Sequence, residues 1–366
     1  VGQMLSLHEG MMPPEVAAVL GALQKSAPRV SFQTMYRQIQ SELPDADRLF
    51  RSLEREPFAA ASIGQVYRGV LHDGRSVAVK VQYPDIDNVV RADLKNLKAF
   101  FSALIGMFVR IDFDPLWDEL RDRLLEELDY QQEAEHMREM AVLHSEIPEI
   151  IVPAIVSEAS TARVLTMEFV ESIDPTAACS ERYPTTLKDR WGAVLFRFVV
   201  RGLLEHRFLH ADPNFANFGF REDGGLVVYD YGCMKRVPPA LADAYARLIG
   251  AVLDSRRAEI PRILKDMGVY HKNGGGSLEL ELIEPIFDLA DEIFSAREPY
   301  RFVHDPELYA RFFDLGRNRW QDTTDVQIPR DMIFIDRTLG GVVANLASLR
   351  AQAPWRELLE SFLPPA

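Results

Sequence analysis

Two short strand-like runs joined by a tight-turn sequence most strongly constrain the fold of this chain. Residues 63–71 and 76–83 are rich in β-branched and apolar side chains, and His72-Asp73-Gly74 separates them. Glycine accepts the backbone angles of a tight turn, so this pattern favours a β-hairpin. Pro84 closes the second run. We therefore expect antiparallel strands in the first quarter of the chain.

Helical patterns dominate the remainder. Ser31 is expected to cap a short helix that starts at Phe32. Helical periodicity then covers about 85–109, 115–144, 187–206 and much of 238–363, while 150–157, 162–170 and 226–231 are strand-like. A chain of 366 residues holds about two domains. This order predicts a bilobal α+β fold with an N-terminal helical extension (1–50), a β-rich lobe with inserted helices (51–170) and an α-rich lobe (171–366).

Composition excludes several classes of protein. The formal charge of −14 argues against a nucleic-acid binder, which needs a basic face for phosphates. Two cysteines distant in sequence suit a reducing compartment. The most apolar run, 99–109, is shorter than the roughly 20 residues that cross a bilayer, and the first residues lack the pattern of a signal peptide. We therefore expect a cytoplasmic chain without a transmembrane segment.

A lysine inside a predicted strand is the first candidate for chemistry. Lys80 ends the run Val77-Ala78-Val79-Lys80, and the small residues Ala59-Ala60-Ala61-Ser62 precede the strand before it. Small side chains let the backbone approach a bulky ligand such as a phosphate. Each feature also has an ordinary interpretation, because strand lysines are usually solvated and small residues also fill tight turns.

A second constellation lies in the α-rich half. Asp212 is followed five positions later by Asn217, and Asp230 then ends an apolar strand within Asp230-Tyr231-Gly232. Carboxylate and amide oxygens suit Mg²⁺, which keeps further positions for substrate phosphates. Turn chemistry explains each residue separately but not the ordered set. With Lys80, this order matches the parts that transfer phosphoryl groups in protein-kinase folds.

The sequence resembles the UbiB-type (AarF/ADCK) family of atypical protein-kinase-like proteins over essentially its whole length. The alanine-rich segment, with Ile63-Gly64-Gln65-Val66 after it, is similar to the loop that replaces the glycine-rich loop in this family. Glu127-Leu128-Asp129 and Glu133 match its Glu-x-Asp motif and its lysine-pairing glutamate, and 334–341 is similar to a later landmark. The chain opens Val1-Gly2-Gln3, so the lysine of the family's Lys-x-Gly-Gln motif would precede residue 1.

The resemblance implies a bilobal protein-kinase-like fold with ATP and Mg²⁺ as cofactors. It assigns Lys80 and Glu133 to nucleotide positioning, Asp212 to the acceptor or water, and Asn217 and Asp230 to the metal. The other implied nucleotide contacts are Ala59, Ala60, Ala61, Ser62, Val66 and Ala78, with main-chain contacts at Glu168 and Val170. The implied contacts of the N-terminal extension are Gln3, Glu127 and Asp129. His210, two residues before Asp212, is assigned to architecture.

Three functional hypotheses follow. The first is an ATP-dependent kinase or ATPase of the UbiB type that supports ubiquinone or related isoprenoid-lipid metabolism, with a lipid-pathway partner and a peripheral membrane contact. The second is a small-molecule kinase similar to aminoglycoside phosphotransferases, which also use a His-x-Asp…Asn loop. The third is a nucleotide-switched scaffold with negligible turnover. Filled lysine and metal positions argue against a dead pseudokinase.

Overall fold

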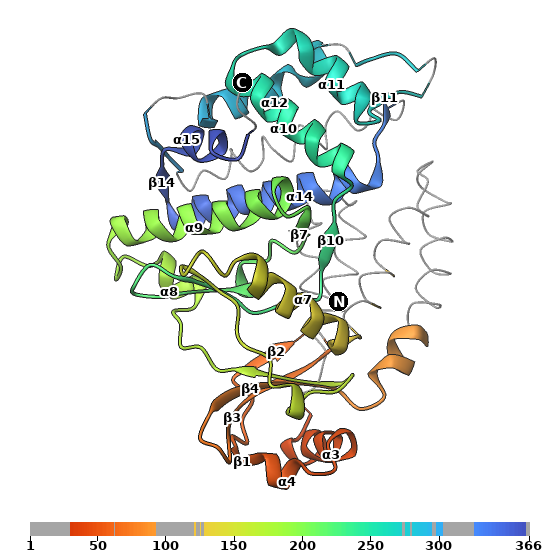
Figure 1. The fold of residues 1–366 in the computed structure, drawn as a ribbon, viewed down its shortest axis with the longest axis vertical. Helices are drawn as coiled ribbons and strands as arrows, with labels where there is room; N and C mark the ends of the chain where they lie inside the picture. The colour runs from red at the N-terminus through yellow and green to blue at the C-terminus, as the bar shows by residue number, and fades with distance from the viewer. Residues whose placement is uncertain are drawn as a thin grey trace. The chain divides into compact units, whose positions relative to one another are not determined.

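The chain divides into two compact units that are interleaved along the sequence. The computed structural model describes residues 30–61, 63–92, 121, 125, 128–272, 275–278, 280–294, 298–302 and 326–363 (Figure 1). Unit 1 contains Val1–Val142, Val152–Val170 and Asp230–Cys233. Unit 2 contains Leu143–Ile151, Glu171–Tyr229 and Met234–Ala366. The expected positions Gln3, Ser62 and Glu127 lie outside the described residues.

A five-stranded antiparallel sheet forms the centre of unit 1. Its order is β1-β3-β4-β6, and β2 pairs with β3 at one end. The strands are β1 (Phe50–Leu53), β2 (Ala59–Ala61), β3 (Gly64–Leu71), β4 (Ser76–Gln82) and β6 (Val164–Glu168). The predicted hairpin is confirmed, because β3 and β4 pair antiparallel around a turn where Gly74 has a φ of +94°. That left-handed angle explains the glycine.

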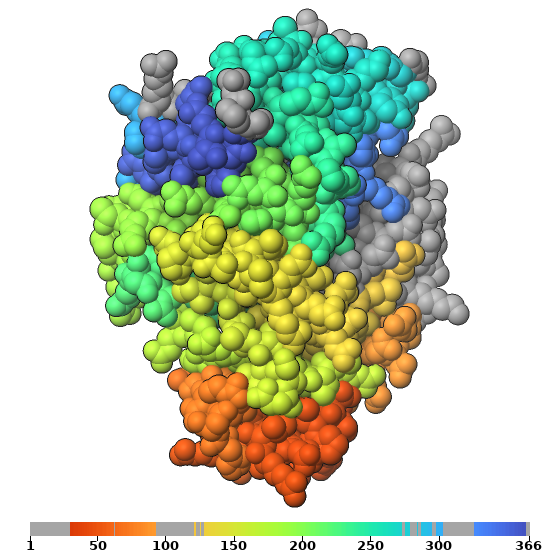
Figure 2. Space-filling model, viewed as in Figure 1, coloured from red at the N-terminus to blue at the C-terminus, as the bar shows by residue number. Residues whose placement is uncertain are grey.

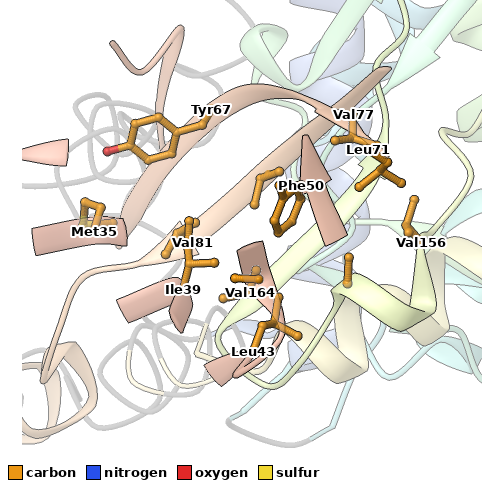
Figure 3. Packing of buried hydrophobic residues seen from close by; sticks show 13 residues of the cluster. Met35, Ile39, Leu43, Phe50, Tyr67, Leu71, Val77, Val81, Val156 and Val164 are labelled. Atoms are coloured by element: carbon orange, nitrogen blue, oxygen red, sulfur yellow. The ribbon is translucent and has the colours of Figure 1, made fainter. Parts of the chain in front are cut away.

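Helix α3 (Phe32–Glu42) covers one face of this sheet. The predicted cap is confirmed, since the Ser31 hydroxyl accepts a hydrogen bond from the Thr34 amide. Met35 and Ile39 on α3 belong to one buried cluster with strand side chains that include Val77 and Val81, and the short helix α4 (Ala46–Leu49) follows (Figure 3). Since side chains alternate along a strand, burial of Val77, Val79 and Val81 turns Ala78 and Lys80 to the opposite face.

The predicted helix over 115–144 is wrong at residues 128 and 129, where the chain leaves helical geometry. The described helix α7 is Tyr130–Leu143. The Asp129 carboxylate accepts hydrogen bonds from the amides of Gln131 and Gln132, and therefore caps α7. Aspartate is favoured at that position because its short side chain reaches the first amides of a helix, which have no partner within it. Asp129 thus begins the helix that carries Glu133.

The predicted strand over 150–157 is also shorter than expected. Only β5 (Ile150–Ile151) is a strand, and a 3₁₀ turn, η1 (Ser157–Ala159), ends the segment. Pro153 lies between them, and proline has no amide proton for a strand ladder. The run predicted over 162–170 forms β6, as expected.

Unit 2 is mainly helical, as predicted after Pro184. Its long helices are α9 (Thr185–Leu204), α10 (Pro239–Leu253), α12 (Leu280–Phe294) and α14 (Arg330–Leu349). Shorter ones are α8 (Pro175–Cys179), α11 (Ile260–Asp266) and α15 (Trp355–Glu360). Helices α9 and α14 lie side by side, and the segments coloured green to blue form a closely packed body in Figure 2.

Short strands in unit 2 carry the loop that contains Asp212. Strand β7 (Phe208–His210) pairs with β10 (Met234–Arg236), and β8 (Phe218–Phe220) forms a hairpin with β9 (Leu226–Val228), which also pairs parallel with β5. The run predicted over 226–231 therefore ends at Val228. The loop between β7 and β8 contains a 3₁₀ turn, η2 (Phe215–Asn217).

Among the described residues, one helix is long and apolar enough to cross a membrane by length and composition, namely α14. Half of its most apolar window is buried within the structure. Core helices of globular proteins pass the same test, and α14 packs against α9 in that manner.

Candidate functional site

One face of the unit 1 sheet collects the residues predicted to contact a nucleotide. Val66 on β3 lies opposite Lys80 on β4, and Ala78 lies opposite Met167 on β6. Residues directly opposite each other on neighbouring strands share a face. Val66, Ala78 and Lys80 therefore point away from the core under α3. A single face of one small sheet presents an apolar surface and a cation.

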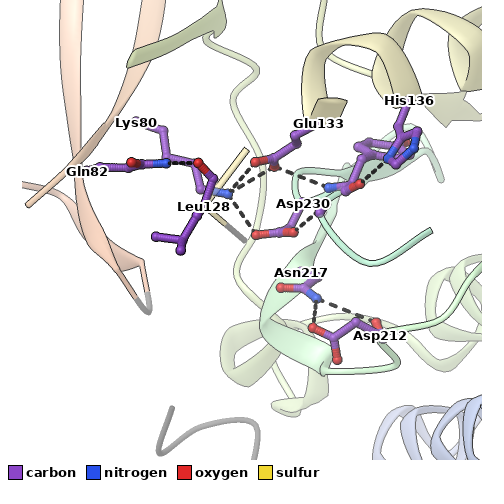
Figure 4. A network of polar contacts seen from close by, with 10 residues as sticks. Lys80, Gln82, Leu128, Glu133, His136, Asp212, Asn217 and Asp230 are labelled. Atoms are coloured by element: carbon purple, nitrogen blue, oxygen red, sulfur yellow. Dashed lines mark hydrogen bonds and ion pairs between the residues drawn. The ribbon is translucent and has the colours of Figure 1, made fainter. Parts of the chain in front are cut away.

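Lys80 is the centre of a buried ion cluster (Figure 4). Its Nζ lies 2.9 and 3.0 Å from the two carboxylate oxygens of Glu133 and 2.9 Å from Oδ2 of Asp230. Lys80 is 8% exposed and Glu133 only 2%. The three protons of the ammonium thus meet three carboxylate oxygens. The structure brings together three predicted residues that are far apart in sequence.

Burial and charge oppose each other in this cluster. Burial alone lowers the pKa of Lys80, but the carboxylates of Asp230 and Glu133 outweigh it, so the pKa is raised well above its ordinary value. Burial also raises the pKa of Glu133 to about 7, against the lowering effect of Lys80. One ammonium between two carboxylates leaves a net negative charge when both are ionised. A divalent cation would be attracted to such a site.

Main-chain contacts fix the groups around the ion cluster. The Gln82 side chain on β4 donates to the Leu128 carbonyl at 2.9 Å and so holds the chain just before α7. Nδ1 of His136 lies 3.0 Å from the Tyr231 carbonyl oxygen, and Nδ1 carries the proton because the carbonyl can only accept. The Tyr231 amide donates to Glu133. Helix α7 therefore contacts the segment after Asp230 through two side chains.

The alanine-rich segment forms a strand at the end of the sheet. Ala59, Ala60 and Ala61 make up β2, which pairs with the start of β3, and Ala59 and Ala60 are exposed. Gly64 follows at a point of close approach, since a Cβ atom there would lie 2.1 Å from the Val81 carbonyl oxygen. Only glycine fits this position without moving the backbone of β4.

The end of β6 and the residue after it make more contacts than the sequence indicated. The Glu168 amide donates to the Ala154 carbonyl at 2.8 Å, so a further main-chain contact of Glu168 would use its carbonyl oxygen. Phe169, the next residue, packs edge-on against Phe58 and lies 4.2 Å from the Arg68 guanidinium. Sequence reasoning missed this aromatic and cationic group. Alternation along β3 could have placed Arg68 beside Ala78.

Asp212 and Asn217 form a second cluster, within unit 2 (Figure 4). Nδ2 of Asn217 donates to Oδ2 of Asp212 at 2.8 Å. Donation by the amide nitrogen leaves the amide oxygen of Asn217 as an acceptor for another group. The Asp212 carboxylate also accepts from the Asn214 amide, so the turn chemistry considered for this loop is present as well. Metal-binding and turn interpretations are compatible here.

His210 precedes this loop and Tyr229 lies opposite its end, and both have defined surroundings in unit 2. His210 is 3% exposed and packs against the rings of Phe198 and Phe218, which also contact each other, and this is a structural environment. Asn217 and Tyr229 face each other at the open end of the β8–β9 hairpin, where the Tyr229 amide donates to the Asn217 carbonyl at 2.9 Å. Asp230 is the next residue along the chain. The nucleotide, acceptor and metal roles that the resemblance implies for these five polar residues stay predictions.

The family follows from comparison with known proteins. The ABC1 atypical kinase-like domain family matches residues 22–264, more than half of the chain. The chain therefore belongs to the ABC1 atypical kinase-like family, and the resemblance to the UbiB type is confirmed. A structure of a Mycobacterium tuberculosis complex, Rv3197 with erythromycin, is similar with a TM-score of 0.75 and 26% identity, over 100% of this chain and 91% of that one. The α+β, bilobal kinase-like fold class is confirmed.

Several curated proteins are similar in sequence. Uncharacterized protein sll0005 of Synechocystis is 36% identical over 262 residues, which are 70% of this chain and 38% of that protein. Atypical kinase COQ8B of rat is 33% identical over 270 residues, which are 73% of this chain and 51% of that protein. Atypical kinase coq-8 of Caenorhabditis elegans is 30% identical over 312 residues, which are 83% of this chain and 41% of that protein. The chain spans about half or less of the length of these relatives.

Proposed function

We propose that this chain is an ATP-binding, Mg²⁺-dependent phosphotransferase or ATPase of the UbiB type. The observation that carries the proposal is the buried contact of Lys80 with Glu133 and Asp230. Burial of an ammonium costs several kcal/mol of desolvation, and ionisable groups perturbed both by burial and by charged partners cluster at functional sites. Membership of an atypical kinase-like family supports the same conclusion.

Each cluster has a role in this proposal. Lys80, oriented by Glu133, binds phosphate oxygens, while Val66 and Ala78 contact the adenine ring and the main chain at Glu168 and Val170 contacts its edge. Ala59, Ala60, Ala61 and Ser62 cover the phosphates. The exposure of Ala59 and Ala60 supports the last role, since small side chains let a phosphate approach the main chain.

Mg²⁺ is bound by Asp230 and Asn217 in this proposal. Both offer the hard oxygen donors that Mg²⁺ prefers, and the amide orientation of Asn217 leaves its oxygen as an acceptor. Among the residues that the structure describes, no three His, Cys, Asp or Glu side chains form a metal site, so the phosphates would supply remaining ligands. Bound Mg²⁺ supplies positive charge that stabilises the transferring phosphoryl group.

Asp212 orients the acceptor hydroxyl or a water molecule. Its contact with Asn217 and the Asn214 amide holds the carboxylate in one orientation, which positioning of a nucleophile requires. A lipid-pathway acceptor, in ubiquinone or related isoprenoid metabolism, belongs to the proposal through the family resemblance alone. The roles of Gln3, Glu127 and Asp129 in an extension, a cytoplasmic location and a peripheral membrane contact stay predictions.

Single-turnover hydrolysis of ATP tests the proposal. The Asp212→Asn variant should lose about 100-fold or more in rate and keep its nucleotide affinity, because Asp212 acts on the acceptor. Lys80→Ala should instead weaken nucleotide binding in a titration with Mg-ATP. Equal hydrolysis rates for wild type and Asp212→Asn would favour the nucleotide-switched scaffold, and unchanged affinity of Lys80→Ala would remove Lys80 from its role.

A second experiment separates the two enzymatic hypotheses. The protein is supplied with labelled ATP, Mg²⁺ and either fractionated lipid extract or soluble alcohols and antibiotics. Label on a lipid would support the UbiB-type proposal. Label on a soluble antibiotic would support the small-molecule kinase, which stays in the comparison because the similar mycobacterial protein was solved with erythromycin.

A further inference from the structure

Helix α14 presents three residues at four-residue spacing to the loop that contains Asp212. They are Arg337, Gly341 and Asn345, and we call them the loop-anchoring face. Residues spaced by four lie along one side of an α-helix. Segment 334–341 resembles a landmark of the family, but the proposed function gives it no role. The family match at 22–264 does not extend to this helix.

All three residues contact the loop next to Asp212. The Arg337 guanidinium donates to the Ala211 carbonyl at 3.0 Å, and the Asn345 side-chain amide donates to the Pro213 carbonyl at 2.9 Å. Between them, a Cβ atom on Gly341 would lie 2.3 Å from Cβ of Pro213, so the helix backbone meets the proline ring directly. The contacts therefore hold residues on both sides of Asp212.

Helix α14 is itself held in unit 2. The Tyr245 hydroxyl on α10 donates to the Asp336 carboxylate at 2.7 Å, and α14 lies along α9 (Figure 1). Asn345 is 6% exposed, so its hydrogen bond is protected from water. A helix packed in this way provides a rigid support for the loop.

We propose that the loop-anchoring face positions Asp212 for the reaction, an inference that rests on the proposed function. The hydrogen bond to Ala211 fixes the peptide plane that precedes Asp212. The proline ring fixes φ at residue 213 and also restricts the residue before it. With the Pro213 carbonyl also bound, Asp212 keeps little rotational freedom. Arg337, Gly341 and Asn345 are positioning residues, since they touch the loop and not the reacting atoms.

Two adjacent glycines allow a matched test. Gly341→Ala places a methyl group against Pro213, whereas a Cβ atom at Gly340 meets nothing within 4 Å. Both changes lie inside α14 and raise its intrinsic helix propensity equally. We expect Gly341→Ala to slow single-turnover hydrolysis about 100-fold, the order of loss for a displaced catalytic group, with nucleotide affinity within about two-fold of wild type. Gly340→Ala should hydrolyse ATP at the wild-type rate.

Two further substitutions add no heavy atoms to α14, unlike Gly341→Ala, and so test the inference with less risk of misfolding. Asn345→Leu removes the donor to Pro213 and keeps the branched shape and the number of heavy atoms, and Arg337→Met removes the donor to Ala211. Both should lower kcat about ten-fold without raising KM for ATP, as expected for loss of one hydrogen bond that positions a catalytic group. Arg337→Lys keeps a donor and should recover most of the rate. Equal rates for Arg337→Met and Arg337→Lys would contradict the inference.

Hydrogen exchange tests the anchoring without any enzymatic activity. The amides of Asn214, Ala216 and Asn217 are hydrogen-bonded within the loop and report its order. In Gly341→Ala they should exchange at least ten-fold faster than in Gly340→Ala, while amides of β4 exchange equally in both. This result would stand even if the wild type hydrolysed no ATP, which would refute only the proposed function. Equal exchange at the loop in the two variants would overturn the inference.

Discussion

The two polar clusters of this protein are built in contrasting ways. In unit 1, Lys80 meets Glu133 and Asp230, so full charges face one another in a largely buried place. In unit 2, Asp212 is held without an ion pair among the contacts described, because the Asn217 amide bonds its carboxylate and Arg337 and Asn345 on α14 bond neutral main-chain carbonyls on both sides of it. One cluster depends on balanced charge and the other on backbone position.

The contrast explains why mutations should act differently in the two places. Removal of one member of a buried ion pair leaves an uncompensated charge, which is costly. Loss of a neutral hydrogen bond to a carbonyl costs much less stability but allows the backbone to move. We therefore expect unit 1 substitutions to appear first in stability and nucleotide affinity, and α14 substitutions to appear first in turnover.

The largest expected effect on stability is at Lys80. Lys80→Met should lower the free energy of unfolding by about 3 kcal/mol near pH 8, because Glu133 is left charged and buried. Lys188 in unit 2 is the matched control, since this buried lysine donates to the Cys179 carbonyl and not to a carboxylate. Lys188→Met should cost about 1 kcal/mol in urea unfolding. Equal losses would show that charge is not what distinguishes the clusters.

The pH dependence of stability should identify Glu133. Its pKa rises from 4.5 to about 7 on folding, so the folded state holds more protons between these values. The contribution of Glu133 to the free energy of unfolding is therefore fully present below pH 4.5 and is lost as the pH rises through 7. At about 1.4 kcal/mol per pH unit, the loss is about 3 kcal/mol. Urea unfolding of wild type and Glu133→Gln from pH 5 to 8 measures it, and identical slopes would contradict the assignment.

Asn345→Leu should reduce stability by about 1 kcal/mol, the usual contribution of one neutral hydrogen bond. The loss should be the same in 0.05 and 0.5 M NaCl, because no charge is removed. Chemical unfolding at both salt concentrations measures it. A strong salt dependence would mean that the α14 contact is electrostatic, and the contrast between the clusters would disappear.

The smallest expected effect concerns Arg68 and Phe169. Arg68→Met should lower the free energy of unfolding by about 0.5 kcal/mol, the usual size of an exposed cation–π contact. Arg68→Lys keeps the cation and should be closer to wild type. Thermal unfolding of wild type, Arg68→Met and Arg68→Lys measures these differences in stability. A loss above about 2 kcal/mol would mean that Arg68 belongs to the electrostatic group around Lys80.

Local signals predicted much of the fold. The β3–β4 hairpin followed from a glycine turn between two strand-like runs, and α3 followed from the Ser31 cap. Helix α9 begins and ends within two residues of its predicted bounds. Predictions failed where a single side chain overrode a regional pattern, as Asp129 does by starting α7 and Pro153 by interrupting the strand after β5.

The candidate site was predicted unevenly for a similar reason. Residue types and order indicated Lys80, Asp212, Asn217 and Asp230, and the family resemblance added Glu133. The structure groups Lys80 with Glu133 and Asp230 and pairs Asp212 with Asn217. The contacts of His136 with Tyr231 and of Arg68 with Phe169 were missed, because neither has a motif. Such contacts join segments separated by about a hundred residues.

Local chemistry in the sequence determined the strands, the main helices, the family and the residue types available for phosphate and metal binding. Only the tertiary structure decided that Lys80 contacts two carboxylates at once and that α14 reaches the backbone beside Asp212. The physical reason is the separation along the chain of the residues that interact. Turns and caps depend on neighbours within a few residues, whereas burial and long-range hydrogen bonds arise only after distant segments pack together.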